Sequence, residues 1–418
     1  MTNGENDLDS EGNLPPPRTA SIVIYPEPGK VDSRPQYLSA LAGYTKSLLS
    51  RLPAEEQQRH LILTNQKTEL PRSFRDGDIR VEECWRKGEL RFVFQIVRTL
   101  RRFPTIDVIH LQHEFNQFGP AKTIPCIPLL LWILRFIYRK KIIVTWHEVL
   151  DPKLLTKDFL RAVCIPYPAW FTRIAVRLYY FITSLAISLI FVQDQAFEDV
   201  LRRLGVRKPI KILRIGADDI IDLPTRQTAR SRHGINSDEH VVLFFGTLDW
   251  RKGLDLMIDT MNMTPDLRFR LVIAGGQPPR IRDTTAYKRW LDALEKKMAC
   301  AQDRIIRRGF IEMEELSEWM AAADLMILPY IVPQRISAVL NLAISAEMPI
   351  IASEHINSQT HPSQLFPATS EGLKEKLAWA FEHLDELREI TRELRTIHSW
   401  NNSASVLSEA YQMLVEKT

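Results

Sequence analysis

Short apolar runs alternate along most of the chain with longer segments in which apolar residues recur at helical spacing. The runs expected to form strands are 21–25, 60–64, 108–111, 142–145 and 189–192 in the first half, and 241–245, 271–274, 305–308, 325–328 and 350–352 in the second. Each run is almost continuously apolar, which is typical of strands covered by helices on both faces of a sheet. The alternation predicts an α/β fold with two doubly wound parallel sheets.

A polar stretch with Gly216, Pro224 and Gly234 separates the two series and is expected to connect two domains. The N-terminus is acidic and polar and contains three successive prolines, so we expect a disordered tail over 1–19. The predicted domains are then 20–220 and 221–400, both Rossmann-like, followed by a C-terminal helix over 401–418 that packs on the first domain.

Composition narrows the class of protein. Of 418 residues, 45% are hydrophobic and 25% charged, which excludes collagen-like and wholly disordered chains. A net charge of +4 is too small to indicate a nucleic-acid partner. Cys84, Cys126, Cys164 and Cys300 form no CxxC pair, so neither a zinc site nor a disulfide framework is predicted. The N-terminus also lacks the basic start and apolar run of a signal peptide. We expect a reducing, cytoplasmic location and no metal or other cofactor.

Titratable residues follow two strands of the first half. Since ligands bind beyond the carboxyl ends of parallel strands, His113 and Glu114 after 108–111 and His147 after 142–145 are candidate catalytic residues. An imidazole can exchange protons with a sugar hydroxyl near neutral pH. Without a nucleophile motif or paired carboxylates, we favour substrate positioning over covalent or metal-dependent chemistry. A purely structural role is the alternative for both histidines.

The second half offers two places for an anionic ligand. Gly246 ends a strand and allows close backbone approach, and Arg251 and Lys252 directly precede a helix that starts near Gly253. Ser337 is predicted to cap a second helix, leaving the amides of Ala338 and Val339 available to phosphate oxygens. Each pattern alone is typical of an ordinary solvated helix start. Two such starts on one domain favour a nucleotide-diphosphate site.

Several segments resemble the retaining nucleotide-sugar glycosyltransferases of family 4, which have the two-domain GT-B fold. In the second half these are FFGTLDWRKGLDLMI, LVIAGG and RRGFIEMEELSEWMAAADLMILPY. In the first half, DVIHLQHEFNQFG and IIVTWHEVL are similar to segments of one branch of the family. The last helix, SWNNSASVLSEAYQML, is similar to the family's helix that returns to the first domain.

The resemblance implies a role for each matched residue. The first domain would bind the acceptor and the second the nucleotide sugar. Lys252 and Arg251 would hold the donor diphosphate, the backbone around Phe310 and Ile311 would meet the nucleobase, and His147 would lie beside the transferred hexose. The predicted reaction is transfer of a hexose, with retention, to a hydroxyl of a glycan or lipid-linked sugar in the synthesis of a polysaccharide or glycolipid.

One departure from the family keeps an alternative open. The usual pair of glutamates falls on Gln334 and Leu342, and Ala338 stands at the glycine of the branch motif. A catalytically degenerate GT-B protein, acting as a partner subunit or a glycan-binding module, is therefore the second hypothesis. A sugar-nucleotide epimerase is a weaker third, since no carboxylate cluster is evident.

Two segments of the first half combine apolar and basic residues. Within 85–103, an apolar face of Leu90, Val93, Phe94, Val97 and Leu100 is accompanied by Arg91, Arg98, Arg101 and Arg102. The segment 127–141 is apolar and then basic. Such helices either pack on the sheet or lie on an anionic membrane. Peripheral contact with the inner face of the membrane is thus a further prediction.

Overall fold

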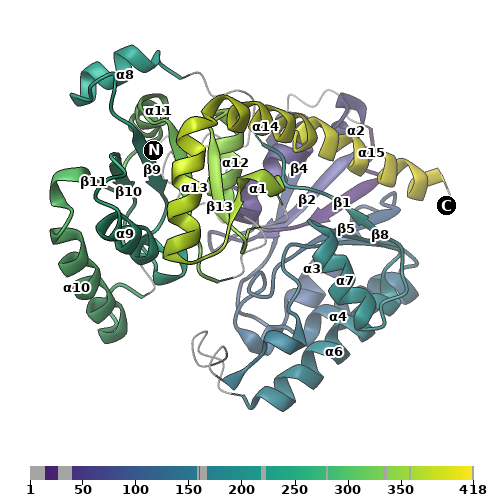
Figure 1. Cartoon of the computed structure of the whole chain (residues 1–418). Helices are drawn as coiled ribbons and strands as arrows, with labels where there is room; N and C mark the ends of the chain where they lie inside the picture. Colours follow the sequence, from purple (N-terminus) through teal and green to yellow (C-terminus); the bar gives the residue numbers. More distant parts are fainter. Residues whose placement is uncertain are drawn as a thin grey trace, which may run out of the picture. The chain divides into compact units, whose positions relative to one another are not determined.

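The computed structural model describes residues 15–26, 40–157, 160, 167–217, 223–278, 281–332, 337–356 and 359–416. The chain forms two compact units, shown in Figure 1. Unit 1 comprises Met1–Arg214 and Trp400–Thr418, and unit 2 is the continuous segment Ile215–Ser399. The boundary expected at 220/221 falls in 218–222, outside the described residues, so the unit border at Arg214/Ile215 precedes it by a few residues.

Unit 1 contains an eight-stranded sheet in the order β3-β4-β2-β1-β5-β6-β7-β8. All neighbours are parallel except β3 and β4. The strands are β1 (Thr19–Ile22), β2 (His60–Asn65), β3 (Ser73–Asp76), β4 (Ile79–Trp85), β5 (Val108–His113), β6 (Lys141–Trp146), β7 (Leu189–Val192) and β8 (Ile210–Ile212).

The sequence placed the start of this sheet too late. Residues 1–14 of the expected tail lie outside the described residues, but Arg18 is paired with Asp107 and Thr19 opens β1. The first strand is therefore Thr19–Ile22 and not 21–25. The Arg18–Asp107 pair holds the chain directly before it enters β1.

Helices cover the unit 1 sheet, and the C-terminal helix α15 packs with them: Tyr411 of this helix contacts His110 of β5. Within the described part of the chain, no helix is long and apolar enough to cross a bilayer. The helices are α1 (Ala40–Leu49), α2 (Ala54–Gln58), α3 (Phe92–Leu100), η1 (Ala121–Thr123), α4 (Cys126–Trp132), the π-helical turn η2 (Ile133–Ile137), η3 (Pro152–Leu154), α6 (Ala169–Ala186), α7 (Gln195–Arg203) and α15 (Trp400–Glu416).

The basic helix expected over 85–103 is shorter and oriented differently from the prediction. Trp85 is the last residue of β4, and α3 begins only at Phe92. The buried face consists of Phe92, Val93, Ile96 and Leu100. Leu90 and Phe94, which were expected on the apolar face, are exposed.

Unit 2 contains a six-stranded, fully parallel sheet in the order β11-β10-β9-β12-β13-β14. Its strands are β9 (Val241–Phe245), β10 (Arg270–Ala274), β11 (Ile305–Gly309), β12 (Leu325–Leu328), β13 (Ile350–Ser353) and β14 (Leu365–Phe366). Its helices are α8 (Arg226–His233), η4 (Trp250–Lys252), α9 (Leu254–Met263), α10 (Thr285–Ala299), η5 (Gln302–Arg304), α11 (Met313–Ala322), α12 (Ala338–Ser345), η6 (Pro362–Gln364), α13 (Ser370–Glu382) and α14 (Leu384–Ile397).

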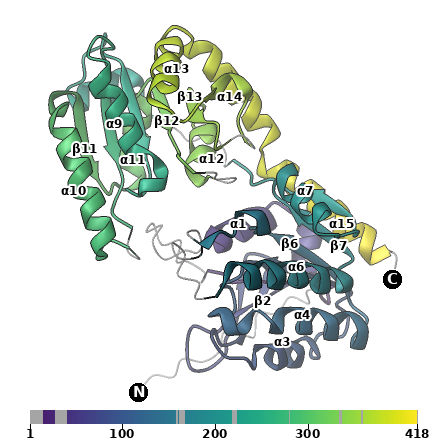
Figure 2. The ribbon, with the colours of Figure 1, turned by 60° about the horizontal axis from the view of Figure 1, so that its bottom comes forward.

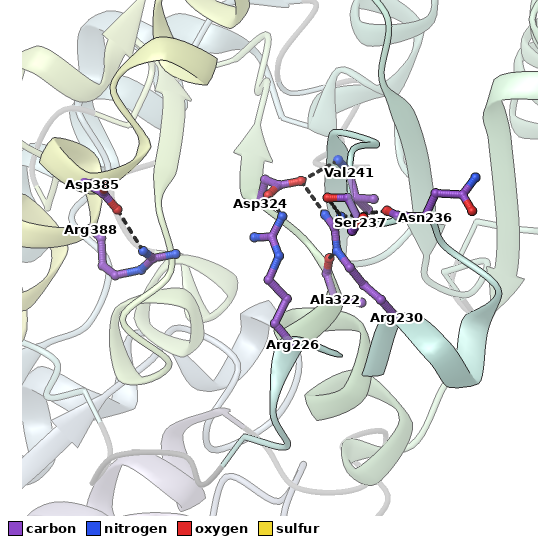
Figure 3. Close-up of polar contacts among 9 residues, drawn as sticks. All are labelled: Arg226, Arg230, Asn236, Ser237, Val241, Ala322, Asp324, Asp385 and Arg388. Carbon is purple, nitrogen blue, oxygen red and sulfur yellow. Dashed lines mark hydrogen bonds and ion pairs between the residues drawn. The ribbon is translucent and has the colours of Figure 1, made fainter. Parts of the chain in front are cut away.

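Ion pairs of the buried Asp324 connect helix α8 to the amino-terminal edge of this sheet. Asp324, next to the start of β12, accepts hydrogen bonds from the Val241 amide at 2.8 Å and from Arg230 of α8 at 2.7 Å, and also pairs with Arg226 (Figure 3). A cavity of about 460 Å³ opens here, lined by Asp324 and Arg226 and by Arg388 from α14. The pairs fix α8 against the sheet at the edge opposite the loops that carry the predicted donor residues.

Candidate functional site

The carboxyl-terminal edge of the unit 2 sheet is built from glycines that bring three loops into backbone contact. Gly246 follows β9, Gly275 follows β10 and Gly309 ends β11. The Gly246 amide donates to the Ala274 carbonyl at 3.0 Å, and the Gly275 amide donates to the Gly309 carbonyl at 2.6 Å. A Cβ atom at position 275 would lie 1.7 Å from the Gly246 oxygen. The close approach therefore requires glycine.

The predicted basic pair lies on η4, directly before α9, as the sequence indicated. Asp249 caps η4 by accepting a hydrogen bond from the Arg251 amide at 3.0 Å, and it also holds the Arg251 guanidinium. The next residue, Gly253, has a φ of +69°, and a Cβ there would lie 1.8 Å from the carbonyl oxygen of Pro329. The turn carrying Lys252 is thus pressed against the segment that follows β12.

Lys252 and Ser337 are linked through Tyr330. The Lys252 ammonium lies 3.9 Å from the centre of the Tyr330 ring, a cation–π contact. The Tyr330 hydroxyl is in turn 3.0 Å from the Ser337 hydroxyl. Burial, with a smaller contribution from Arg251, lowers the pKa of Lys252 to about 8. The lysine remains mostly charged at neutral pH but has little water around it, which strengthens its attraction for an anion.

Ser337 caps α12, confirming that prediction, since its side chain accepts a hydrogen bond from the Leu340 amide at 3.3 Å. The first amides of a helix have no partner within the helix, so those of Ala338 and Val339 lie at the positive end of the helix dipole. A Cβ at Gly246 would lie 3.5 Å from Val339 Cγ2. The structure therefore brings together the two helix starts that the sequence singled out.

Of the two residues that follow β11, Phe310 is exposed and Ile311 is buried. Phe310 is 46% exposed, and its Cβ would be 3.5 Å from a Cβ at Gly276, in the loop after β10. Ile311 is buried in the core of unit 2. Only Phe310 can offer its side chain to a ligand here, and contact of this segment with a nucleobase stays a prediction.

In unit 1, His113 is fully buried at the end of β5, where its Nε2 contacts the Tyr179 hydroxyl of α6. Burial lowers its pKa to about 4, so it is neutral at physiological pH. The neighbouring Glu114 is partly buried; that burial, together with the nearby Glu148, raises its pKa. His113 therefore has a structural contact, whereas Glu114 retains access to solvent at the strand ends.

His147 is held between two glutamines. Gln112 Oε1 lies 2.7 Å from His147 Nε2, and Gln193 Nε2 lies 2.7 Å from His147 Nδ1. Because an amide oxygen can only accept, Nε2 carries the proton and Nδ1 accepts from Gln193. Burial and the nearby His113 lower the pKa of His147 to about 3. Its ring is thus a fixed, neutral hydrogen-bonding group rather than an acid–base group near pH 7.

Sequence reasoning missed three members of these two clusters. Gln193 directly follows β7, and Tyr330 is the second residue after β12. The strand-end position that pointed to His147 could have found both. Tyr44, whose ring meets that of His147 edge-on at 4.6 Å, lies in the middle of α1 and carries no such signal.

Among the described residues, no group of three or more His, Cys, Asp or Glu side chains is arranged to hold a metal ion. Cys84, Cys126 and Cys300 are free thiols, and Cys164 falls outside the described residues. These strand ends carry a lysine, helix amides, neutral imidazoles, glutamines and the carboxyl group of Glu114.

Residues 239–383 match the family described as glycosyl transferases group 1, a range that includes all the predicted donor residues. A curated relative, the D-inositol 3-phosphate glycosyltransferase of Xylanimonas cellulosilytica, is 31% identical over 111 residues. That match covers 26% of this chain and spans about a quarter (24%) of the relative.

Solved structures resemble nearly the whole chain. Sucrose-phosphate synthase from Thermosynechococcus elongatus matches with a TM-score of 0.68 and 16% identity, covering 96% of this chain and 100% of that one. HepE from Anabaena, solved in complex with UDP, matches with a TM-score of 0.66 and 16% identity over 95% of this chain and 100% of that one. The structures confirm the GT-B fold, and the family match and the curated relative support a glycosyltransferase.

Proposed function

We propose that this protein transfers a hexose from a nucleotide-diphosphate sugar to a hydroxyl group of a glycan or lipid-linked acceptor, with retention of the anomeric configuration. The product would be part of a polysaccharide or glycolipid, made on the cytoplasmic side of the membrane. The observation that supports this most directly is the cluster of Lys252, Tyr330 and Ser337 beside Gly246.

The cluster has the chemistry that a departing diphosphate requires. Lys252 supplies a poorly hydrated positive charge, and the α12 amides at Ala338 and Val339 supply the positive end of a helix dipole. Such fixed groups stabilise the negative charge that develops when the bond between the sugar and the diphosphate breaks. Arg251 contributes positive potential next to Lys252 while its guanidinium is held by Asp249.

We assign the acceptor side of the reaction to unit 1. His147 would lie beside the transferred sugar, held in place by its two glutamine partners, which occupy both ring nitrogens. Glu114 would contact the acceptor hydroxyl, and its raised pKa keeps it a better proton acceptor than an ordinary glutamate. His113 would orient the loop through Tyr179. Positioning and leaving-group stabilisation then account for the rate.

The test is calorimetric titration of the full chain with a panel of nucleoside diphosphates and their sugars. We expect selective micromolar binding of one nucleotide that weakens at least tenfold in Lys252→Ala. The matched control is Lys376→Ala, because Lys376 also lies over an aromatic ring, that of Trp379 at 3.6 Å, but on α13. Absence of binding to every nucleotide by the folded protein would refute the proposed donor site.

A second experiment tests transfer. The protein is incubated with the sugar nucleotide that it binds and with hydroxyl acceptors, and the anomeric configuration of the product is determined by NMR.

One observation favours the alternative of a catalytically degenerate protein. Of the two positions where family 4 has glutamates, Gln334 lies outside the described residues, and Leu342 on α12 packs against the core of unit 2. Position 342 thus contributes packing and no carboxylate. Tight nucleotide binding with no transfer to any acceptor, and no hydrolysis of the donor, would favour this alternative.

A further inference from the structure

Helix α6 exposes a continuous apolar stripe to solvent. Its exposed large residues are Trp170, Phe171, Ile174, Leu178, Phe181, Ile182 and Leu185. Their spacing of three and four places them on one side of the helix, and the buried residues, Val176, Tyr179, Tyr180 and Thr183 among them, lie on the other. Trp170, at the start of the helix, is 66% exposed. A stripe of this kind is costly in water and normally marks an interaction site.

The stripe continues onto the neighbouring helices. Trp132, at the end of α4, donates a hydrogen bond to the Ile182 carbonyl of α6 at 3.0 Å, which joins the two exposed surfaces. Trp132 and Phe136 of η2 are in ring contact at 5.1 Å, and Phe136 and Ile137 are both exposed. Figure 2 shows α6, α4 and α3 following one another along unit 1. We name the exposed apolar side chains of α3, α4, η2 and α6 the aromatic face.

The helices that carry the aromatic face have charges of one sign. Helices α3, α4, η2 and α6 contain no Asp or Glu. Arg173 and Arg177 follow one edge of the α6 stripe, and Arg98 lies on the surface of α3. Arg139 and Lys140 follow η2 after Tyr138. Between α3 and η2, a groove of about 240 Å³ combines the apolar Val97 and Leu134 with Arg101 and Lys140.

We infer that the aromatic face docks unit 1 on an anionic lipid bilayer. Tryptophan and phenylalanine side chains favour the boundary between headgroups and acyl chains, and arginines reach the lipid phosphates from there. The apolar stripe lies along α6 and the opposite side of α6 packs on unit 1, so the helix rests in the plane of the membrane. A second copy of the chain is disfavoured as the occupant, because a two-fold contact would place these like charges against one another.

The docking helix also borders the candidate acceptor residues. On its buried side, Tyr179 contacts His113, and the Tyr180 hydroxyl accepts a hydrogen bond from the Leu150 amide at 2.9 Å, just beyond His147. One helix therefore separates the bilayer from the strand ends of β5 and β6. If the proposed transferase activity is correct, this arrangement favours an acceptor anchored in lipid, but docking itself does not depend on that activity.

Vesicle sedimentation tests the inference in the absence of any nucleotide. We expect the full chain to bind vesicles of phosphatidylcholine with phosphatidylglycerol, and to bind pure phosphatidylcholine or high-salt samples at least tenfold more weakly. The triple variant Trp170→Ser, Phe171→Ser and Phe181→Ser should lose at least tenfold in affinity. The control changes three exposed apolar residues of unit 2, Met263→Ser, Met313→Ser and Ile397→Ser, and should bind like the parent.

Contact with the acyl chains is checked separately from simple attraction of charges. Brominated lipids should quench part of the tryptophan fluorescence of the parent, and Trp170→Phe should remove much of that quenching while it keeps vesicle binding. Equal binding of the triple variant and the parent, or no vesicle binding by the parent, would overturn the inference. A parent dimer that the triple variant loses, without vesicle binding, would identify a second copy as the occupant and also overturn it.

Discussion

The lowered pKa of Lys252 predicts how nucleotide binding at the proposed donor site depends on pH. Burial lowers its pKa to about 8, from an ordinary value of 10.5. An anionic diphosphate is attracted by the ammonium form, and the fraction in that form falls about tenfold for each pH unit above the pKa. We therefore expect the affinity for the nucleoside diphosphate to be nearly constant from pH 6.5 to 7.5 and to fall about tenfold between pH 8.5 and 9.5.

The matched variant for this pH profile is Lys252→Arg, because a guanidinium keeps its charge over the whole range. Its affinity at pH 7 should be lower, since a larger, planar guanidinium replaces an ammonium that is mostly buried beside the Tyr330 ring. Its profile should be flat from pH 7 to 9.5. A parent profile that is equally flat by calorimetry would show that the titration of Lys252 does not control binding.

At the level of elements, the junction between η4 and α9 depends on Gly253. Its φ of +69° is in the left-handed region, and a Cβ there would lie 1.8 Å from the Pro329 carbonyl oxygen. Gly234, which ends α8, has a nearly identical φ of +63° with nothing within 4 Å of its Cβ position. The comparison of Gly253→Ala with Gly234→Ala thus separates the clash from the backbone strain.

We expect Gly234→Ala to lower the free energy of unfolding by about 1–2 kcal/mol, because alanine is strained in the left-handed region. Gly253→Ala should cost more and should also weaken nucleotide binding at least tenfold, because η4 must move away from Pro329 and take Lys252 from the Tyr330 ring. Urea unfolding and calorimetry on the two variants provide the measurements. Equal losses of stability and unchanged nucleotide binding in both would contradict the close approach.

Elements were predictable from sequence where their surroundings were uniformly apolar. Strands β9 and β12 have the predicted bounds because each is a buried run with hydrophobic neighbours on both faces. Strand β4 was missed because Glu82 and Glu83 interrupt its pattern, although both are buried and paired with Arg102 and Arg72. Such pairing is made by residues distant in sequence, and a local pattern does not contain it.

The same limit applies to the candidate site. Ser337 and Lys252 could be predicted because a helix start and a strand end are local features. The glutamines that fix His147 come from the ends of two different strands, β5 and β7, and become neighbours only in the folded sheet. Periodicity identifies which strands exist, and their order in the sheet decides which side chains meet.

At the level of the whole molecule, buried histidines make unit 1 sensitive to acid. Burial lowers the pKa of His60 and His147 to about 3 and that of His113 to about 4. All three ordinarily titrate near 6.5, so the unfolded chain binds more protons than the folded chain between about pH 6.5 and pH 4. Stability must therefore decrease as pH falls through this window, by about 1.4 kcal/mol per pH unit for each histidine.

We expect hydrogen exchange to show that β1, β5 and β6 lose protection before β9 and β10 as the pH is lowered from 7 to 4.5. In unit 2, burial lowers the pKa of His233 as well. In unit 1, burial lowers the pKa of four histidines, because His110 shares the behaviour of His60, His113 and His147. His60 bridges Thr19 and Ser21 of β1 through its two ring nitrogens, at 2.7 and 2.9 Å. His60→Gln should lower stability at pH 7 and reduce the slope between pH 6.5 and 4.5 by about 1.4 kcal/mol per pH unit. If the order of loss is reversed, or the slope is unchanged in this variant, carboxylates rather than buried histidines control the acid unfolding of the chain.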